Sequence, residues 1–240
     1  MKNILIILFL LVSSVVSGQN TKKTIELPEF KSIYNNSNYS IYLKQTNKQE
    51  VAVEALTEIF DVTEIKVENG VLIVNVDRKP DNQSKSVWAK IDDIKINPTM
   101  KLIISMKSIQ ELQVNGGGKI IAENSLASDK LSLVVTGSGG LDLDVKGNEI
   151  DGEVSGSGNI AIKGYDTSLN VLMSGSGAFN GFNCELESAK VKMSGSGACE
   201  LNVTGSLDAF VSGSGTLKHK GNTKNVIRKI YGSGTVDRAY

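Results

Sequence analysis

Proline and excess basic charge are both lacking in this sequence. Only three prolines occur among 240 residues, so the chain cannot form a collagen triple helix, which needs abundant proline and glycine at every third residue. Lysine and arginine together number 26, as do aspartate and glutamate, and the formal net charge is zero. Because no basic excess is present to hold a phosphate backbone, we expect no nucleic-acid partner.

Histidine occurs once, at His219, and no acidic or cysteine residue accompanies it at the spacing of a metal site. A Ca²⁺-binding glycine repeat needs a nine-residue period with a regular aspartate, and a nucleotide-binding glycine loop needs a following helix. The sequence has neither pattern, so we predict no metal and no cofactor. We expect His219 to be a surface residue near the C-terminal end.

The N-terminus has the features of a secretory signal peptide over residues 1–18. Lys2 supplies the positive region, an apolar run extends from Ile4 to Val16, and the small residues Ser17 and Gly18 suit a cleavage site. The run is short for a membrane-spanning helix, although an N-terminal membrane anchor is the alternative. The sequence therefore predicts an exported mature chain without a transmembrane segment, located in the periplasm, at the cell surface or outside the cell.

Glycine is abundant, and much of it lies in a Gly-Ser-Gly repeat with a period of about 19 residues. The six triplets begin at Gly137, Gly156, Gly175, Gly195, Gly213 and Gly232, and a related Gly-Gly-Gly begins at Gly116. In every repeat the residues two before and four after the first glycine are apolar. Apolar residues keep to even offsets, which is the period of a β-strand with one buried face, and no segment has the 3.6-residue period of a helical solenoid.

These features predict an all-β fold: a single-stranded, right-handed parallel β-helix with about 19 residues per coil. Each coil would contain a strand, the Gly-Ser-Gly bend, a second strand and a looser return, and stacking would bury the apolar face. We interpret both glycines as inward positions at a narrow corner and the serine as an outward turn residue. Arg228 and Arg238 interrupt the inward pattern, which indicates a polar C-terminal cap.

The first half of the chain is β-rich but less regular. We assign residues 19–110 to the same domain as the regular coils of residues 111–240, with a separate N-terminal cap as the alternative. Alternating apolar residues flank Asn69-Gly70, a dipeptide typical of a two-residue hairpin turn. Residues 77–86 are predicted to be a polar loop, after which the strand pattern resumes at Ile94.

The two cysteines, Cys184 and Cys199, lie in neighbouring repeats, and an exported protein can join such residues. The repeat register directs Cys199 into the core and leaves Cys184 near a corner of the preceding coil. We therefore expect free thiols, with a disulfide as the alternative.

Two sets of outward residues are candidate sites. Three positions before the repeat glycine, apolar side chains alternate with charged ones where all should face water; the apolar members are Val134, Leu172 and Phe210. Exposed apolar residues mark an interaction face, which the N-terminal segment, a second subunit or a ligand would cover. The second set is acidic and is predicted to lie on adjacent coils: Asp142, Asp144, Asp151 and Glu153. Glycoside hydrolysis needs two carboxylates at a fixed separation, but we favour a solvated acidic surface.

The six Gly-Ser-Gly steps from Gly137 to Gly234, with their flanking Val, Met and Leu positions, follow a signal segment and a β-rich lead-in. In these features the chain resembles the putative auto-transporter adhesin family with a head GIN domain, from about Phe30 to Arg238. The resemblance implies an exported right-handed β-helix with an adhesin label and no assigned catalytic residues. No site residue is therefore carried over from the family.

The sequence predicts an exported, non-enzymatic β-helix that binds a surface protein or a glycan, or has a structural role in the cell envelope. Self-association is a further option for the exposed apolar column. The competing class is a carbohydrate-active β-helix enzyme, for which the four acidic residues are the candidate acids. The two classes differ in that an enzyme gathers carboxylates and a basic group in one groove.

Overall fold

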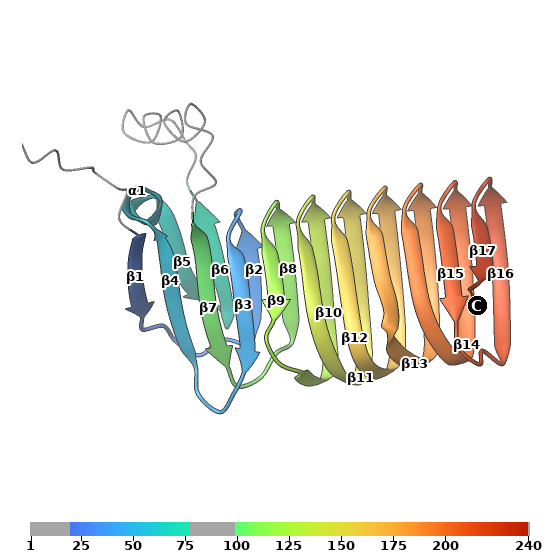
Figure 1. Ribbon diagram of the computed structural model, residues 1–240, viewed down its shortest axis with the longest axis horizontal. Helices are drawn as coiled ribbons and strands as arrows, with labels where there is room; N and C mark the ends of the chain where they lie inside the picture. The colour runs from blue at the N-terminus through green and yellow to red at the C-terminus, as the bar shows by residue number, and fades with distance from the viewer. Residues whose placement is uncertain (1–19, 77–98, 240) are drawn as a thin grey trace, which may run out of the picture.

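A computed structural model of the protein describes residues 20–76 and 99–239 (Figure 1). Strand accounts for 76% and helix for 3% of the structure, and the strands form a solenoid of about seven turns with coils about 19 residues apart. The predicted all-β solenoid is therefore confirmed. The predicted signal peptide, the polar loop at residues 77–86 and the strand at Ile94 lie outside the described residues.

The regular coils follow one another along the solenoid axis, from green to red in Figure 1. Their strands are β8 (Glu111–Gly116), β9 (Lys119–Ala122), β10 (Leu126–Gly137), β11 (Gly140–Gly156), β12 (Asn159–Gly175), β13 (Ala178–Gly195), β14 (Ala198–Gly213), β15 (Thr216–Lys220), β16 (Asn225–Gly232) and β17 (Thr235–Arg238). Equivalent residues pair in parallel, so that Val154 lies between Val135 and Met173. Strands β11 to β14 each run unbroken between successive bends, so the return predicted to be loose is continuous strand.

The Gly-Ser-Gly bends stack directly on one another. The N–H of Ser157 donates to the carbonyl oxygen of Gly137 at 2.9 Å, and the bond recurs in later bends. Gly156 has φ +109°, and a Cβ there would lie 2.8 Å from the Gly137 oxygen. At the buried Gly158, a Cβ would lie 2.6 Å from the Gly139 oxygen. The inward prediction is thus right for the second glycine only. The first is exposed, and its backbone angle and close stacking require glycine.

Apolar side chains fill the interior of the stack. Val135, Val154 and Met173 form one buried column, and Phe179 is fully buried in another. Gly152 occupies an inward position where a Cβ would lie 2.8 Å from the Phe179 ring. The absence of a side chain at Gly152 therefore leaves space for this ring. Burial of apolar surface stabilises the fold by about 25 cal/mol per Å², and only stacked coils bury enough of it.

The N-terminal coils are stacked in an order that differs from their order in the sequence. Strands β2 (Ser32–Asn36) and β3 (Ser40–Gln45) pair in parallel with β8 and β9. Their other edges pair in parallel with β6 (Val71–Val76) and β7 (Met100–Met106), which come later in the chain. The chain therefore builds the second coil of the stack before the first.

Antiparallel strands and a short helix close the N-terminal end. These elements are β1 (Asn20–Ile25), β4 (Glu50–Leu56), α1 (Thr57–Asp61) and β5 (Thr63–Glu68). β4 pairs with both β7 and β1, and β5 pairs with β6. Helix α1 connects β4 to β5 at the end of the stack (Figure 1), and its Ile59 is fully buried. Asn69 and Gly70 join β5 to β6 with positive φ angles of 51° and 77°, which confirms the predicted hairpin.

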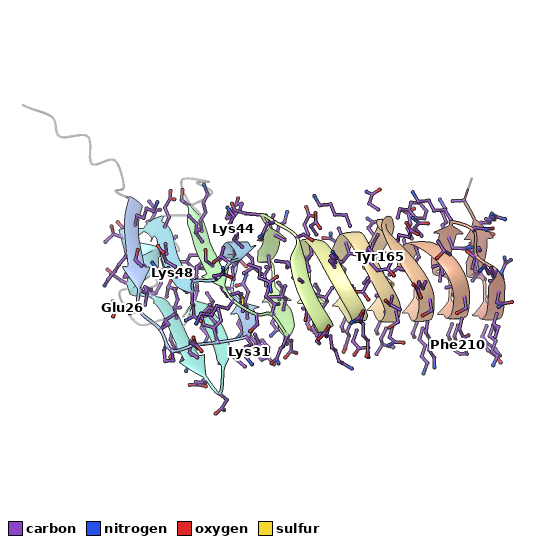
Figure 2. All side chains as sticks on the ribbon, turned by 90° about the horizontal axis from the view of Figure 1, so that it is seen from below. Glu26, Lys31, Lys44, Lys48, Tyr165 and Phe210 are labelled. Carbon is purple, nitrogen blue, oxygen red and sulfur yellow. The ribbon has the colours of Figure 1, made fainter. Side chains whose placement is uncertain are left out.

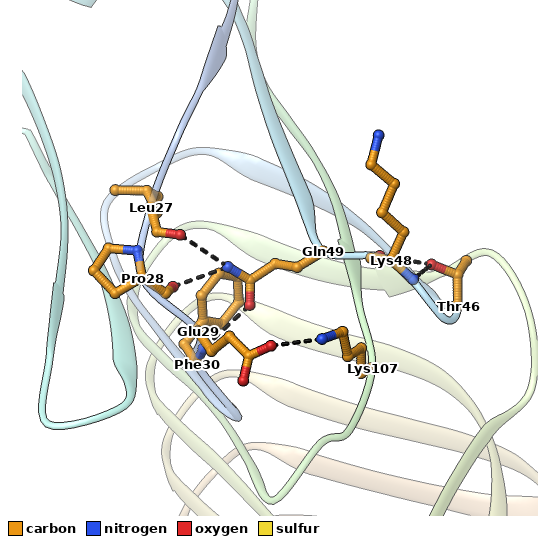
Figure 3. Close-up of polar contacts among 8 residues, drawn as sticks. All are labelled: Leu27, Pro28, Glu29, Phe30, Thr46, Lys48, Gln49 and Lys107. Atoms are coloured by element: carbon orange, nitrogen blue, oxygen red, sulfur yellow. Dashed lines mark hydrogen bonds and ion pairs between the residues drawn. The ribbon is translucent and has the colours of Figure 1, made fainter.

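One glutamine fixes the link between β1 and β2, as Figure 3 shows. Gln49 Nε2 donates to the carbonyl oxygens of Leu27 and Pro28 at 3.2 and 2.9 Å. Its Oε1 accepts the N–H of Phe30 at 3.2 Å. The side chain thereby satisfies backbone groups of a segment that has no strand partner.

Candidate binding face

Two columns of outward side chains run along the strands that precede the Gly-Ser-Gly bends. The first column comprises Gln113, Val134, Glu153, Leu172, Lys192, Phe210 and Lys229. The second comprises Glu111, Ser132, Asp151, Asn170, Lys190, Asp208 and Ile227. Neighbours in a column are about 4.8 Å apart, because this is the spacing of paired strands. We call the surface formed by these two columns the outer face.

The outer face is hollowed along much of its length. A groove of about 380 Å³ is lined by both columns between Val134 and Lys192. An adjoining depression of about 240 Å³ continues toward Ile227. The two hollows share Asn170 and Lys190 as lining residues. A ligand lying along the solenoid axis would therefore contact several coils at once.

Large apolar side chains are exposed on and beside this face. Leu172 is 50% exposed, Phe210 37% and Ile227 56%, whereas Val134 is half-buried. In Figure 2, the labelled Phe210 lies among side chains that project away from the ribbon. Tyr231, from β16, is 62% exposed, and its ring centroid lies 5.4 Å from that of Phe210. Exposed aromatic and aliphatic groups gathered over a groove are typical of an interaction surface.

The described N-terminal strands do not cover the outer face, because they form the opposite end of the stack (Figure 1). Cover by a ligand or by a second subunit stays a prediction.

The charges of the outer face differ along its length. Asp151 lies 3.0 Å from the Lys130 ammonium and accepts a hydrogen bond from Asn170 at 3.0 Å, and these contacts lower the pKa of its carboxyl group. Toward the C-terminal end, Lys190, Lys192 and Lys229 have no carboxylate within ion-pair distance among the described residues. The face is therefore neutralised at Asp151 and cationic beyond it.

The four acidic candidates lie on one strand, β11, and not on adjacent coils as predicted. The buried positions change parity between Val145 and Ile150, which marks a corner that separates Asp142 and Asp144 from the other two. The register places none of the four beside another; their neighbours in β12 are Ala161, Lys163, Asn170 and Leu172. Asp144 lies 3.7 Å from the Lys163 ammonium. A glycosidase acid needs a raised pKa, whereas that of Asp151 is lowered.

Sequence reasoning missed one buried carboxylate, Asp166, which is only 2% exposed. Its Oδ1 accepts the N–H of Ser168 at 3.3 Å, and burial raises its pKa to about 6. The register aligns Asp166 with Gly147 and with the buried Leu186 in a column that faces the core. This column could have been identified from the sequence only if the segment that returns from one bend to the next had been predicted to be strand. Asp166 lines neither hollow of the outer face.

His219 is buried, so its prediction as a surface residue is wrong. It occupies the inward column between Leu201 and Arg238, and its Nδ1 lies 3.2 Å from the Thr223 hydroxyl. Burial and the nearby guanidinium groups of Arg228 and Arg238 lower the pKa of the imidazole, which favours its neutral form. His219 is buried because the last two coils enclose it. The polar residues of the terminal repeats did not indicate this burial.

Both cysteines are buried, and their thiols are free. Burial raises the pKa of the Cys184 thiol to about 12 and also raises that of Cys199. Neither sulfur is therefore a thiolate at neutral pH, the form that reacts or binds metals. Across the described residues, no group of three His, Cys, Asp or Glu side chains is placed to hold a metal ion. The same residues contain no helix that is long and apolar enough to span a membrane.

The fold and the outer face define a β-solenoid with an exposed lateral surface. Residues 29–223 match the family described as "Putative auto-transporter adhesin, head GIN domain", and the chain belongs to this family. Among proteins with curated descriptions, none shows significant sequence similarity to this chain.

Several solved structures share the fold. A "putative adhesin" from Bacteroides fragilis superposes with a TM-score of 0.81 at 21% identity, covering 93% of this chain and 98% of that one. A "putative lipid binding protein" from Parabacteroides distasonis has a TM-score of 0.70 at 20% identity, with the same coverages. A "putative adhesin" from the same species has a TM-score of 0.68 at 20% identity, covering 92% and 98%.

Proposed function

We propose that the protein is an exported, non-enzymatic adhesin of the cell envelope that binds its ligand along the outer face. The observation that supports this proposal is the exposure of Leu172, Phe210 and Ile227 over two adjoining hollows of a regular scaffold. Monomeric proteins rarely expose such groups together unless they bind something. The family and the similar structures carry adhesin descriptions, which agree with this role.

The chemistry of the face favours a surface glycan as the ligand. Sugar rings present C–H groups that pack on aromatic faces, and Phe210 with Tyr231 forms such a platform. Sugar hydroxyls bond to carboxylates, amides and ammonium groups, which Asp151, Asn170 and Lys190 supply along the groove. Because the hollows are open and continue across several coils, they fit a polymer chain better than a small enclosed molecule.

An array of bacterial and host polysaccharides tests this proposal, read for both binding and release of reducing ends. Phe210→Ala is expected to weaken glycan binding by about tenfold, because truncating an aromatic anchor removes at least about 1.4 kcal/mol. Tyr165→Ala is the matched control. Tyr165 is 40% exposed, close to the 37% of Phe210, but it lies near the opposite corner of the coil, where it donates to Glu187 at 3.0 Å.

Two results would contradict the proposal. Release of reducing ends that Asp142→Asn or Glu153→Gln abolishes would make the protein an enzyme. Equal losses in the Phe210 and Tyr165 variants would remove the outer face as the site. Binding to a purified surface protein but to no glycan would replace the ligand class and keep the face.

Export is part of the proposal and has its own test. The predicted signal peptide over residues 1–18 leads to a mature chain that begins at Gln19. N-terminal sequencing of the protein from envelope and culture fractions should therefore begin at Gln19. A cell-associated chain that retains Lys2 and the apolar run would instead support the membrane anchor.

A further inference from the structure

The two ends of the solenoid carry opposite charge. At the N-terminal end, residues 20–25 and 50–68, which form β1, β4, α1 and β5, contain six acidic residues and three lysines. At the C-terminal end, residues 216–238, which form β15 to β17, contain six basic residues and one aspartate. The whole chain has a formal net charge of zero, so opposite charges are separated along the axis.

Both ends also present strand edges that have one partner each. Among the described residues, β16 pairs only with β14, and β17 only with β15. At the other end, β5 pairs only with β6, and β1 only with β4. Figure 1 shows β1 at one extreme of the stack and β16 with β17 at the other. Unpaired N–H and C=O groups on such edges readily accept a further strand.

Apolar surface remains uncovered at both ends. Ile230 lies in an inward column yet is 41% exposed, because no further coil of the described chain covers it. Ile227 and Tyr231, on the same strand, are more exposed still. At the N-terminal end, Phe60 and Ile65 are only partly buried against the core. Association of the two ends would bury part of this surface.

The charges at the ends are not balanced within each end. Among the described residues, Arg228 and Lys229 have no carboxylate within ion-pair distance. On β5, Lys66 lies 3.0 Å from the Glu64 carboxylate and 3.1 Å from that of Glu68. One lysine shared by two glutamates leaves this edge strand negative, whereas β16 is positive.

From these observations we propose that copies of this chain associate head to tail, with the C-terminal end of one copy docked on the N-terminal end of the next. The strand directions make β16 antiparallel to β5 of the second copy, on the same side of the solenoid. Lys229, which points outward from β16, then approaches Glu64 and Glu68, which are exposed on β5. Such a contact joins two different surfaces and does not close on itself, so it generates linear chains.

The overall charge of the two ends also favours this orientation. Pairing of two C-terminal ends would place cations against cations, and pairing of two N-terminal ends would place carboxylates together. The charge pattern therefore selects one orientation. The proposal goes beyond the glycan proposal, since it concerns the two ends of the solenoid, although Lys229 belongs to both the outer face and the C-terminal end.

The first test is sedimentation velocity of the purified protein over a range of concentrations at low and high salt. The Debye length falls from about 10 Å at 0.1 M salt to about 3 Å at 1 M salt. We expect oligomers that grow with concentration at 0.1 M and dissociate at 1 M. A monomer at both salt concentrations, up to the limit of solubility, would overturn the proposal.

Charge reversal at each end tests the orientation. The C-end variant combines Arg228→Glu with Lys229→Glu, and the N-end variant combines Glu64→Lys with Glu68→Lys. Each variant alone should sediment as a monomer, because its two ends now have the same sign along the paired edge strands. An equimolar mixture should associate again, since each variant keeps one unchanged end that fits the other.

Controls separate this result from misfolding. Lys146→Glu reverses an exposed charge in the middle of the stack and should leave association unchanged. The circular dichroism spectrum and the melting temperature of all variants should match the wild type. Oligomers that persist in either end variant, or a mixture that stays monomeric while both proteins are folded, would overturn the head-to-tail assignment. Glycan binding is measured on the N-end variant, whose substitutions on β5 lie outside the outer face, so failure of one proposal leaves the other testable.

Discussion

The coil formed by β2 and β3 and the later coils turn the same corner with different chemistry. Between β2 and β3, the side chain of Asn35 donates to the carbonyl oxygen of Tyr39 at 2.8 Å and accepts the Ser37 hydroxyl at 2.6 Å. The later coils use Gly-Ser-Gly, with backbone bonds from coil to coil. A corner can therefore be built from buried side-chain hydrogen bonds or from glycine. Only the corners built from glycine can be recognised in the sequence, because Gly-Ser-Gly recurs in each of them.

A second corner, at Asp166 in the regular region, is also stabilised by a hydrogen bond to a buried side chain. The N–H of Ser168 donates to Asp166 at 3.3 Å, as the N–H of Ser37 donates to Asn35 at 3.3 Å. Both acceptors lie two residues before the donor, and both are buried. They differ in charge, because Asn35 is neutral whereas Asp166 ionises. Substitutions of Asn35 and Asp166 therefore distinguish the stability contribution of a buried turn hydrogen bond from the destabilisation caused by a buried charge.

The largest effect is expected at the glycine corners. In Gly177→Ala, the added Cβ would lie 2.4 Å from the carbonyl oxygen of Gly158 and 2.6 Å from a Val154 methyl group. We expect a loss of about 4 kcal/mol in the free energy of unfolding, measured with urea. Ser176→Ala, at the exposed centre of the same bend, should cost less than about 0.5 kcal/mol. Similar losses in both variants would contradict the close-stacking account.

The antiparallel N-terminal end is tested by removing its buried side chain. Ile59→Ala should lower the free energy of unfolding by about 3 kcal/mol, because a fully buried isoleucine leaves a cavity. Ile227→Ala, at the opposite end and 56% exposed, should cost less than about 1 kcal/mol. Urea unfolding of both variants checks the difference. An Ile59 variant as stable as the wild type would show that α1 does not help to close the stack.

The charged corner should respond to pH. The pKa of Asp166 is about 6 in the folded chain and about 3.9 when unfolded, so the folded state binds the proton more tightly. Its stabilising contribution is full below pH 4 and is lost as pH rises through 6. Asp166→Asn should therefore gain about 3 kcal/mol over the wild type between pH 4 and pH 7. Urea unfolding at several pH values measures this gain.

Asp151→Asn is a control in which the pH dependence of stability should have the opposite sign, because the pKa of Asp151 is lowered and that of Asp166 is raised. Lys130 lowers the pKa of Asp151, so this carboxylate stabilises the fold at neutral pH and loses that effect as the solution becomes acidic. The pair is exposed, and its effect should be below about 1 kcal/mol. A constant difference between Asp166→Asn and the wild type at every pH would contradict the buried-charge account.

The neutral corner should show an effect that does not depend on pH. Asn35→Ala removes the donor to Tyr39 and leaves buried backbone groups unsatisfied, which should cost about 2 kcal/mol without dependence on pH. Asn36→Ala removes only exposed hydrogen bonds to Asn75 and Asn115 and should cost less than about 1 kcal/mol. Equal unfolding midpoints in urea for the two variants would contradict a structural role for Asn35.

Much of the regular fold was predictable from the sequence, and the irregular part was not. Gly-Ser-Gly at about 19 residues and apolar residues at even offsets indicated the coils, and Asn69-Gly70 indicated the hairpin. The pattern did not reveal that β6 and β7 lie outside β2 and β3. Alternation determines which face of a strand is buried, but it does not determine which strand lies beside it.

The candidate sites divide in the same way. The outward column with Val134, Leu172 and Phe210 could be read from the repeat, because offset determines direction within a strand. The hollows beside it depend on how neighbouring coils curve and on side-chain size. The separation of the acidic residues by the corner between Val145 and Ile150 was also hidden, because that corner has no Gly-Ser-Gly.

The sequence by itself determined the β-solenoid, its coil length and the outward direction of its apolar column, because a period of two residues within a longer repeat permits few other folds. Tertiary structure alone decided that Asp166 and His219 are buried and that opposite charges gather at the two ends. These properties depend on which segments become neighbours. Strand pairing between residues far apart in the chain sets those neighbours, and local sequence does not encode them.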